Sequence, residues 1–305
     1  MDSSHPERKS PLVLSLALSL LLLPLAAAGN HPVLTYHKGP LLSGGINLSL
    51  LFYGQIGRVQ KVALRNFIKS LNTDSPNLEP EVSSWWRIIE SYQAPGNRNS
   101  ARRNPKIQVR VASQVVDRSY SIGKVLIADF LPNLVQKATA GKPNTVAVIF
   151  AAKDVTVQDA CTGNCYLHGV LDSPTLWLGT QKMNAQECVH GQFHRSEYGP
   201  QGITLQPPNG NVGTDAMVMH FAAALAATVT NPYKTGFFGG LPAKPIEAAT
   251  VCPGMFGTGA FPGYTGKVRV DPRTGGGFNA HGFRGTKFLL PALWNPKTSS
   301  CWTTM

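Results

Sequence analysis

The order of apolar and polar residues along the chain predicts alternating strands and helices. Ile46–Tyr53 is apolar and β-branched at its start, as a strand is, and Arg58–Leu71 follows with apolar residues at helical spacing. The continuous apolar run Thr145–Ala152 predicts a central strand buried on both faces. The other predicted elements are a short helix at Ser83–Gln93, a strand at Ile107–Val116, a helix at Ile122–Ala138 interrupted by Pro132, and short strands at Tyr166–Leu171 and Thr175–Leu178. This order predicts an α/β fold with a mixed central sheet and flanking helices.

A fourth helical stretch, residues 215–230, is apolar on every side and is therefore expected to be buried. Asp215 occupies the position of an N-cap, and Asn231-Pro232 ends the helix. Many α/β enzymes place ligands or bases on a buried central helix. This helix offers mostly alanine, one histidine and hydroxyl groups.

The first 28 residues have the pattern of a secretory signal peptide. Glu7-Arg8-Lys9 precedes a leucine-rich run that ends in alanines and Gly29, which suit a cleavage site. The alternative is an uncleaved anchor, because the run approaches the length of a membrane span. Pro24 and the alanines favour cleavage. No later segment looks apolar for long enough to cross a bilayer, so we expect a secreted, soluble, extracellular protein.

We expect residues 29–305 to form one domain. Its parts are an α/β core over about 45–185, the buried helix 215–230, and a C-terminal part, 232–305, in which glycine and proline recur every few residues. That last part is expected to be rich in loops and held by a disulfide.

The formal charge of the chain is +12, with 28 Lys and Arg against 16 Asp and Glu. A secreted protein with this charge attracts polyanions, and outside the cell an acidic polysaccharide is a better partner than nucleic acid. The alternative is that the charge only supplies solubility. The strongest local cationic segment is the predicted loop Pro95–Pro105, whose alternative interpretation is a solvated loop. The candidate polyanion-binding residues are Arg98, Arg102 and Arg103 of this loop and Lys106 directly after it.

The five cysteines are Cys161, Cys165, Cys188, Cys252 and Cys301. Secretion makes disulfides the expected state of most of them. Cys161 and Cys165 enclose a tight loop, and Cys252 and Cys301 can tie the tail to the domain. Because the number is odd, Cys188 is left over as a free thiol or a link to another chain. The spacing after Cys165 fits no closed four-ligand zinc pattern.

Common catalytic and metal-binding patterns are missing from the sequence. It has no Gly-x-Ser-x-Gly elbow, no Walker-type glycine loop and no obvious pair of carboxylates. His190 and His194 have the spacing of two ligands on one helix face, but neighbouring glycines favour a surface loop. For His168 we expect a bond to backbone, for His220 a core position and for His281 a turn. We therefore expect no metal or other cofactor.

One glycosylation sequon, Asn47-Leu-Ser49, lies in the first predicted strand. Whether Asn47 carries a glycan is left open by the sequence.

A series of short motifs resembles the plant Exordium family, also called phosphate-induced protein 1. In order, these motifs are Tyr36-His-Lys-Gly-Pro40, Ser84-Trp-Trp86, Cys161…Cys165…His168-Gly169, Trp177-Leu-Gly179, Tyr198-Gly-Pro200, Pro208-Asn-Gly-Asn-Val-Gly213, Thr228-Val-Thr-Asn-Pro232, Cys252-Pro-Gly-Met-Phe-Gly257 and Leu290-Pro-Ala-Leu-Trp-Asn-Pro296. The resemblance covers about residues 31–305. It implies a protein of the apoplast that is linked to brassinosteroid-responsive growth and cell expansion, with no established enzymatic activity.

The resemblance also bears on the alanine-rich helix at 215–230, which we call the blank helix. Some distant relatives carry His-Glu-x-x-Glu just before the Thr-Asn-Pro, and those ligand positions fall on Ala223, Ala224 and Ala227 here. Glu247 matches an acid in such relatives. The resemblance thus implies a zincin-like helix whose metal site has been lost, because alanine has no donor atom.

One segment departs from the family pattern. A second cysteine usually follows the position of Cys188 in a Cys-Pro-Gly-x-Cys run, and this chain lacks it. The missing partner explains the odd number of cysteines.

Two functions remain after these observations. The first is a non-catalytic secreted protein that binds a component of the cell wall or an extracellular receptor. The second is a cell-wall hydrolase, acting on polysaccharide or peptide, whose active site is assembled by the fold. The blank helix and the cationic charge favour the first.

Overall fold

The computed structural model describes most of the chain from Val33 onward. The described residues are 33–74, 79–93, 105–158, 166–170, 174–179, 193, 205–261 and 264–305. Residues Pro32–Met305 form one compact unit. The expected signal peptide lies outside the described residues.

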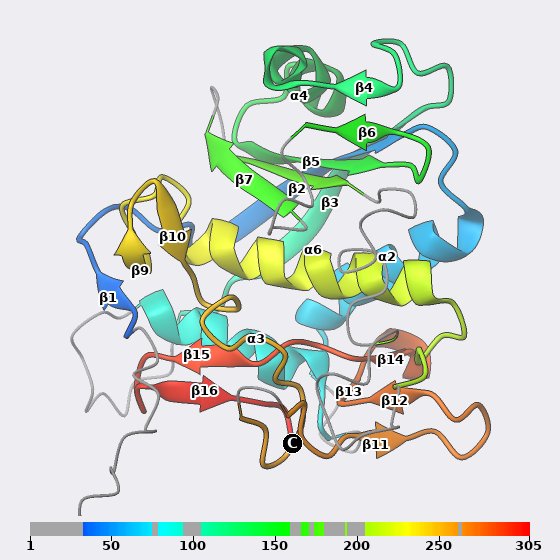
Figure 1. The fold of residues 1–305 in the computed structure, drawn as a ribbon. Helices are drawn as coiled ribbons and strands as arrows, with labels where there is room; N and C mark the ends of the chain where they lie inside the picture. The colour runs from blue at the N-terminus through cyan, green and yellow to red at the C-terminus, as the bar shows by residue number, and fades with distance from the viewer. Residues whose placement is uncertain are drawn as a thin grey trace, which may run out of the picture. The chain divides into compact units, whose positions relative to one another are not determined.

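A five-stranded sheet with the order β3-β2-β5-β8-β7 forms the centre of the fold (Figure 1). Its strands are β2 (Gly45–Tyr53), β3 (Gln108–Asp117), β5 (Thr145–Ala151), β7 (Tyr166–Val170) and β8 (Pro174–Gly179). Strands β3, β2, β5 and β8 are parallel, and β7 is an antiparallel edge strand. Every residue of β5 is buried. The predicted mixed α/β fold is confirmed.

Helices cover both faces of this sheet (Figure 1). Helix α4 (Leu131–Thr139) packs on β2, β3 and β5 from one side. Helix α2 (Arg58–Leu71) and helix α6 (Val212–Thr230) cover the other side, with α2 against β3 and α6 against β7 and β8. Helix α3 (Val82–Glu90), which continues into the 3-10 turn η2 (Ser91–Gln93), packs beneath α2 and α6.

Aromatic rings join these helices. The ring of Phe67 on α2 lies edge-on to Trp85 of α3, Phe221 of α6 and Phe288, with ring centres 6.2, 5.7 and 5.8 Å apart. All four side chains are buried. Edge-to-face contacts are a favoured geometry for buried rings, so this cluster fixes how α2, α3 and α6 pack on one another.

The predicted helix at Ile122–Ala138 is wrong in its first half. A two-residue strand, β4 (Val125–Leu126), pairs there with β6 (Thr156–Val157), and the 3-10 turn η3 (Ala128–Phe130) follows. The helix begins only at Leu131. Pro132 lies in its first turn, where the missing N–H costs no helical hydrogen bond, so the proline starts the helix instead of interrupting it.

The start of the buried helix also needs correction. The N-cap of α6 is Asn211, whose side-chain oxygen accepts a 2.8 Å bond from the N–H of Thr214, and Asp215 lies in the first turn. The predicted end is confirmed, because Asn231 is the C-cap. Contrary to the expectation from sequence, α6 is long and apolar enough to cross a membrane, but 78% of its apolar window is buried inside the protein, as in a core helix.

The C-terminal part consists of small sheets and loops, as predicted, and a disulfide between Cys252 and Cys301 links its two ends. Its strands and turns are β9 (Phe237–Leu241), β10 (Lys244–Ile246), β11 (Arg269–Val270), β12 (Gly277–Phe278), β13 (Ala280–His281), η6 (Phe283–Gly285), β14 (Lys287–Phe288), β15 (Leu293–Asn295) and β16 (Ser300–Trp302). Strand β1 (Thr35–Tyr36) pairs with β9 and so joins the start of the described chain to this part.

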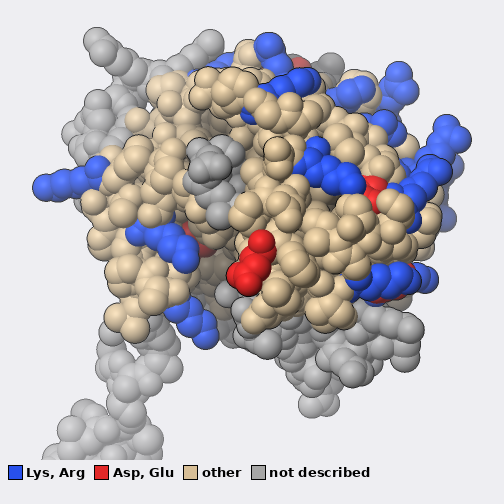
Figure 2. Space-filling view, turned by 90° about the horizontal axis from the view of Figure 1, so that it is seen from above, with Lys and Arg blue, Asp and Glu red and all other residues tan. Residues whose placement is uncertain are grey.

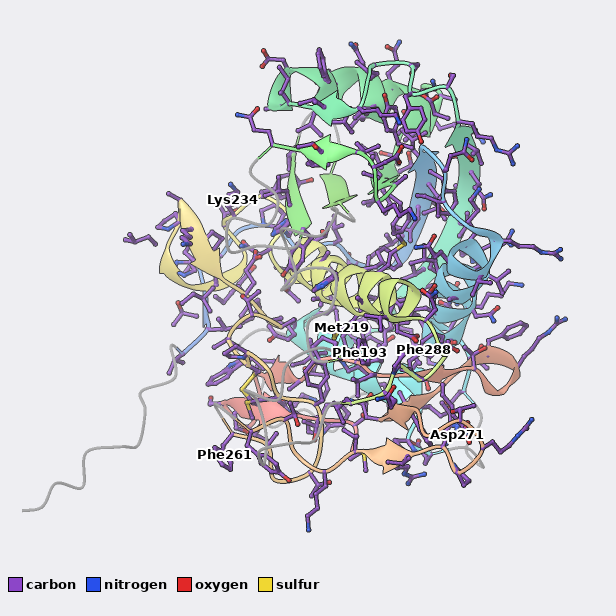
Figure 3. The ribbon with its side chains drawn as sticks, turned by 45° about the vertical axis from the view of Figure 1, so that its right-hand side comes forward. Phe193, Met219, Lys234, Phe261, Asp271 and Phe288 are labelled. Atoms are coloured by element: carbon purple, nitrogen blue, oxygen red, sulfur yellow. A yellow bond between two sulfur atoms is a disulfide. The ribbon has the colours of Figure 1, made fainter. Side chains whose placement is uncertain are left out.

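A small apolar cluster lies beneath α6, on the side of the C-terminal part (Figure 3). It contains Phe193, Met219, Phe256 and Leu289, all buried. Helix α6 is therefore covered by side chains from both the sheet and the C-terminal part. This explains why its sequence is apolar on every side.

Candidate functional site

The C-terminal end of α6 carries a buried polar cluster. The side chain of Asn231 donates a 2.7 Å hydrogen bond to Glu247 Oε1 and accepts a 2.9 Å bond from the N–H of Gly236. Gly236 lies so close to the helix end that a Cβ would be 2.3 Å from the carbonyl oxygen of Thr230. The Thr-Asn-Pro stop thus does two things: it ends the helix and it places an amide beside Glu247.

Glu247 is the centre of this cluster. His168, from the edge strand β7, places its Nε2 atom 2.9 and 2.8 Å from the two carboxylate oxygens. Both side chains are only 6% exposed. The expectation that His168 bonds to backbone is therefore wrong. A carboxylate at this depth requires several polar partners, and His168 and Asn231 supply them.

Two polar atoms beside Glu247 have no partner among the described residues. They are the hydroxyl of Tyr166 and Nδ1 of His168, both on β7. Burial, and secondarily the negative charge of Glu247, raise the pKa of Tyr166 far above its usual value, so its phenol stays protonated. The cluster accordingly presents a neutral hydroxyl and one imidazole nitrogen to its surroundings.

The helix side of this region has no metal ligands. Ala223, Ala224 and Ala227 are all buried, and they contribute only methyl groups. No group of three or more His, Cys, Asp or Glu side chains suited to a metal occurs in the part of the chain that the structure describes. Glu247 is already shared between His168 and Asn231. The described residues therefore do not fit a zinc site, which needs three or four converging donors.

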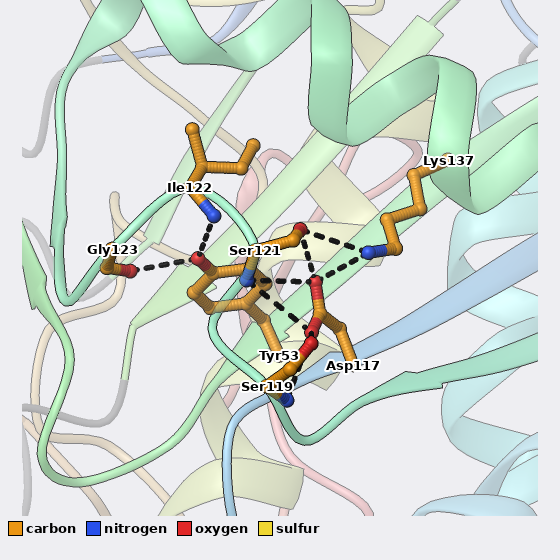
Figure 4. A network of polar contacts seen from close by, with 7 residues as sticks. All are labelled: Tyr53, Asp117, Ser119, Ser121, Ile122, Gly123 and Lys137. Carbon is orange, nitrogen blue, oxygen red and sulfur yellow. Dashed lines mark hydrogen bonds and ion pairs between the residues drawn. The ribbon is translucent and has the colours of Figure 1, made fainter.

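A second polar network lies at the carboxyl end of β3, the edge where open α/β sheets commonly bind ligands (Figure 4). Asp117 accepts bonds from the hydroxyls of Ser119 and Ser121 and forms an ion pair with Lys137. Burial opposes ionisation, but these partners outweigh it and lower the pKa of Asp117 from 3.8 to about 2.

Tyr53 completes this network from the end of β2. Its hydroxyl donates a 2.7 Å bond to the carbonyl of Gly123 and accepts a 2.9 Å bond from the N–H of Ile122 (Figure 4). Together, Asp117 and Tyr53 fix the loop from 117 to 123. The polar groups of this network bond to one another, so they hold the loop in place and leave few free donors or acceptors for a ligand.

Several residues predicted from sequence lie outside the described residues. They are Arg98, Arg102 and Arg103 of the cationic loop, the cysteines Cys161, Cys165 and Cys188, and the histidine pair His190 and His194. Lys106 is described and exposed, and Asn47 on β2 is exposed as well. His281 packs edge-on to Phe278, and burial lowers its pKa.

The distribution of charge between interior and surface is a feature that sequence reasoning missed. Buried acids occur throughout the described residues, namely Glu81, Glu90, Asp117, Asp215, Glu247 and Asp271. In contrast, none of the lysine and arginine residues that the structure describes is buried. Asp271, for example, pairs with the partly exposed Lys287 at 2.6 Å (Figure 3 labels Asp271). The surface is therefore more cationic than the net charge of +12 alone indicates.

Cationic side chains are conspicuous on the face that Figure 2 shows. Lysine and arginine side chains gather towards the right-hand side of this view, where few acidic side chains are visible. The right-hand side in Figure 1 carries the carboxyl ends of β2 and β5 and the turn into α2. The carboxyl edge of the sheet is thus bordered by positive charge.

Comparison with known proteins identifies the family. A family model described as the phosphate-induced protein 1 conserved region matches residues 34–304. The chain is 38% identical over 283 residues to the protein EXORDIUM-like 2 of Arabidopsis thaliana, covering 89% of each chain. It is 38% identical to the protein EXORDIUM of the same plant, covering 95% of this chain and 97% of that one.

The protein PHOSPHATE-INDUCED 1 of Nicotiana tabacum is 35% identical, and the alignment covers 99% of both chains. No solved structure matches the chain. The match over nearly every residue from 34 to 304, and the motifs that recur in order along it, show that the chain belongs to the phosphate-induced protein 1 family, to which the Exordium proteins also belong.

Proposed function

We propose that this protein is a secreted, non-catalytic component of the plant apoplast that supports cell expansion by binding an acidic polysaccharide of the wall. The growth role, including a link to brassinosteroid response, comes from the resemblance to Exordium. The binding role comes from the chain itself.

The observation that carries the binding role is the separation of charge. The described acids are largely internal and bonded, whereas every described lysine and arginine reaches solvent. Such a surface attracts a polyanion at long range and repels other cationic proteins. An extracellular polyuronate has the complementary charge.

The non-catalytic role is supported by the state of α6. A catalytic helix needs donors or bases on its buried face, and Ala223, Ala224 and Ala227 provide none. Glu247 is held by two partners at hydrogen-bonding distance. A carboxylate in this state is a structural group that keeps β7, the end of α6 and the segment after β10 together.

Retention on immobilised polygalacturonate tests the binding role. We expect the purified protein to be retained at low ionic strength and to elute as salt is added, because screening weakens interactions between exposed charges. A column of neutral xyloglucan is the control for affinity to polysaccharide in general. Passage through both columns at low salt would refute the proposal.

The cell-wall hydrolase remains the alternative, and the His168–Glu247 pair is the observation that favours it. A histidine bonded to a carboxylate is a common acid–base arrangement, and Nδ1 of His168 is unpaired among the described residues. Product release from polygalacturonate and from wall glycoprotein would be compared for the wild type and His168→Gln. Turnover that the substitution abolishes would replace the binding proposal by a catalytic one.

A further inference from the structure

Helix α2 carries a row of cationic side chains along its solvent face. Arg58, Lys61, Arg65 and Lys69 are three or four positions apart, so they lie on one side of the helix, opposite the buried Leu64 and Phe67. Over these residues the helix rises by about 16 Å. We call this set the α2 row.

Among the residues that the structure describes, no acidic side chain forms an ion pair with the α2 row. Helix α2 has no Asp or Glu anywhere in its sequence. Within the described residues, the ion pairs of Asp74, Asp117 and Asp154 are made with Arg87, Lys137 and Lys124, which lie on other elements. These three acids are thus already paired, and the α2 row has no ion-pair partner within the described part of the chain.

Two further cations extend the α2 row at its ends. Burial lowers the pKa of Lys61, and the positive charges of Arg118 and Arg65 lower it further. Arg118 is therefore near enough to Lys61 for the two charges to repel each other. At the other end, Lys69 and Arg284 lie 4.8 and 5.3 Å from the centre of the Phe283 ring. Positive charge therefore continues past both ends of the helix.

This arrangement costs stability. Like charges at i and i+4, as in Lys61–Arg65 and Arg65–Lys69, destabilise a helix because the two side chains are neighbours on its surface. Arg58 and Lys61 also lie at the N-terminal end, where the helix dipole disfavours cations. An external anion on this face would remove both penalties.

The α2 row is held on rigid structure. The backbone N–H of Phe283 donates a 2.7 Å bond to Ser70 Oγ, and Asn66 donates a 3.0 Å bond to Thr286 Oγ1. These bonds attach the η6 turn to the helix. The backbone that carries the cationic side chains is therefore fixed before a ligand arrives, although the side chains themselves must still be ordered on binding.

The shape of the α2 row selects among polyanions. Its charges follow a straight line, and the apolar face of α2 is used in the core, so no apolar wedge is left for a bilayer. The exposed apolar side chains on the helix, Val59 and Val62, are single residues and form no anchor pocket for a protein partner. We propose that the α2 row is the docking surface for a linear acidic polysaccharide, a polyuronate.

This inference rests on the proposed function and deepens it. The test compares the full chain with two variants of equal charge. The row variant is Lys61→Gln, Arg65→Gln, Lys69→Gln. The control variant is Lys142→Gln, Lys244→Gln, Arg273→Gln, which removes three exposed cations from other elements. Binding of soluble polygalacturonate is measured over a series of salt concentrations, and circular dichroism confirms that each variant is folded.

We expect the row variant to bind about tenfold or more weakly at low salt. The slope of log K against log salt should be smaller by about two, because fewer counterions are released from the polyanion when fewer cations contact it. The control variant should bind nearly as the wild type does. Equal losses in both variants would overturn the α2 row but leave the proposed function standing. Failure of the wild type to bind would overturn both.

Anionic lipid vesicles containing phosphatidylserine serve as the competing probe. We expect no binding to these vesicles that depends on the α2 row. If the wild type bound the vesicles more tightly than polygalacturonate, and the row variant lost that binding, the α2 row would be a membrane-binding surface and the proposal would be wrong.

Discussion

At the residue level, the start of α6 shows that the sequence predicts a helix more reliably than the residue that caps it. Asp215 was correctly placed at the start of a helix, but the capping group is Asn211, four positions earlier. Both are good N-cap residues, and Gly210, with φ at +72°, marks the turn that precedes the helix. The spacing of apolar residues cannot choose between two nearby caps, since either start keeps the same buried face.

The His168–Glu247 contact could not be predicted. The two residues are 79 positions apart in sequence, and they meet because β7 lies at the edge of the sheet beside the end of α6. Sequence suggested a role for each residue separately: a backbone bond for the histidine and a lost metal site for the acid. Neither suggestion contained the partner.

Asp117 should make stability depend on pH in the acidic range. Its pKa in the folded protein is lowered to about 2, from an ordinary value near 3.8. The ionised carboxylate therefore stabilises the fold fully at pH values above about 3.8, and this stability is lost as the pH falls towards 2. That shift corresponds to about 2 kcal/mol. We predict that Asp117→Asn lowers the free energy of unfolding by at least this amount at pH 6, and by much less near pH 2. Urea denaturation at both pH values measures it, with Asp129→Asn, an exposed acid, as the control.

Asp215 should act in the opposite direction. Burial raises its pKa to about 6, although bonds from Asn209 act against the shift. The folded protein therefore prefers the protonated form, and stability is lost as the pH rises from about 4 through 6. We predict that the difference in unfolding free energy between Asp215→Asn and the wild type moves in favour of the variant by about 3 kcal/mol between pH 4 and pH 7. A difference that does not change with pH would show that Asp215 is ionised at low cost.

At the scale of elements, the helix α2 was predicted with its observed bounds. Its sequence has a clear apolar face and a clear cationic face, and this periodicity alone fixes the helix and its orientation. The strand β5 was predicted for the same kind of reason, because only a strand with both faces covered is apolar throughout. The stretch 122–138 was predicted as one helix, but Val125 and Leu126 pair with β6, a contact between strands that the local sequence does not show.

Phe67 tests how the helices are held together. Its ring contacts those of Trp85, Phe221 and Phe288, which lie on three other elements. We predict that Phe67→Ala lowers the free energy of unfolding by about 3–5 kcal/mol, because it removes a large buried ring and leaves a cavity between α2, α3 and α6. Val59→Ala on the same helix is the matched control. Val59 is 61% exposed, and its replacement should change stability by less than about 0.5 kcal/mol.

Urea denaturation followed by circular dichroism measures both variants, with the midpoint and the slope compared separately. A loss below about 1 kcal/mol for Phe67→Ala would show that the aromatic cluster is not what fixes the packing of the helices.

At the scale of the whole molecule, sequence predicted the family, the α/β fold and the Cys252–Cys301 link. It did not predict the separation of charge, because composition counts acids and bases without showing which of them face inward. The polyanion-binding residues were predicted in the loop 95–105, which lies largely outside the described residues. The structure instead points to the cations on the solvent face of α2.

The packing of α6 alters the meaning of the blank helix. In sequence, α6 is a helix without chemistry. In the structure it is a central support: it packs on β7 and β8, contacts α2 and α3, and places Asn231 beside Glu247. Its alanines allow close packing on every side. Function is therefore expected on the surface.

The metal content of the purified protein tests this most directly. We predict that protein expressed in zinc-supplemented medium and then dialysed contains far less than one zinc per chain by plasma mass spectrometry, and that Glu247→Gln gives the same value. One zinc per chain, lost in Glu247→Gln, would show that the cluster at the end of α6 holds a metal and would contradict a non-catalytic role for this helix.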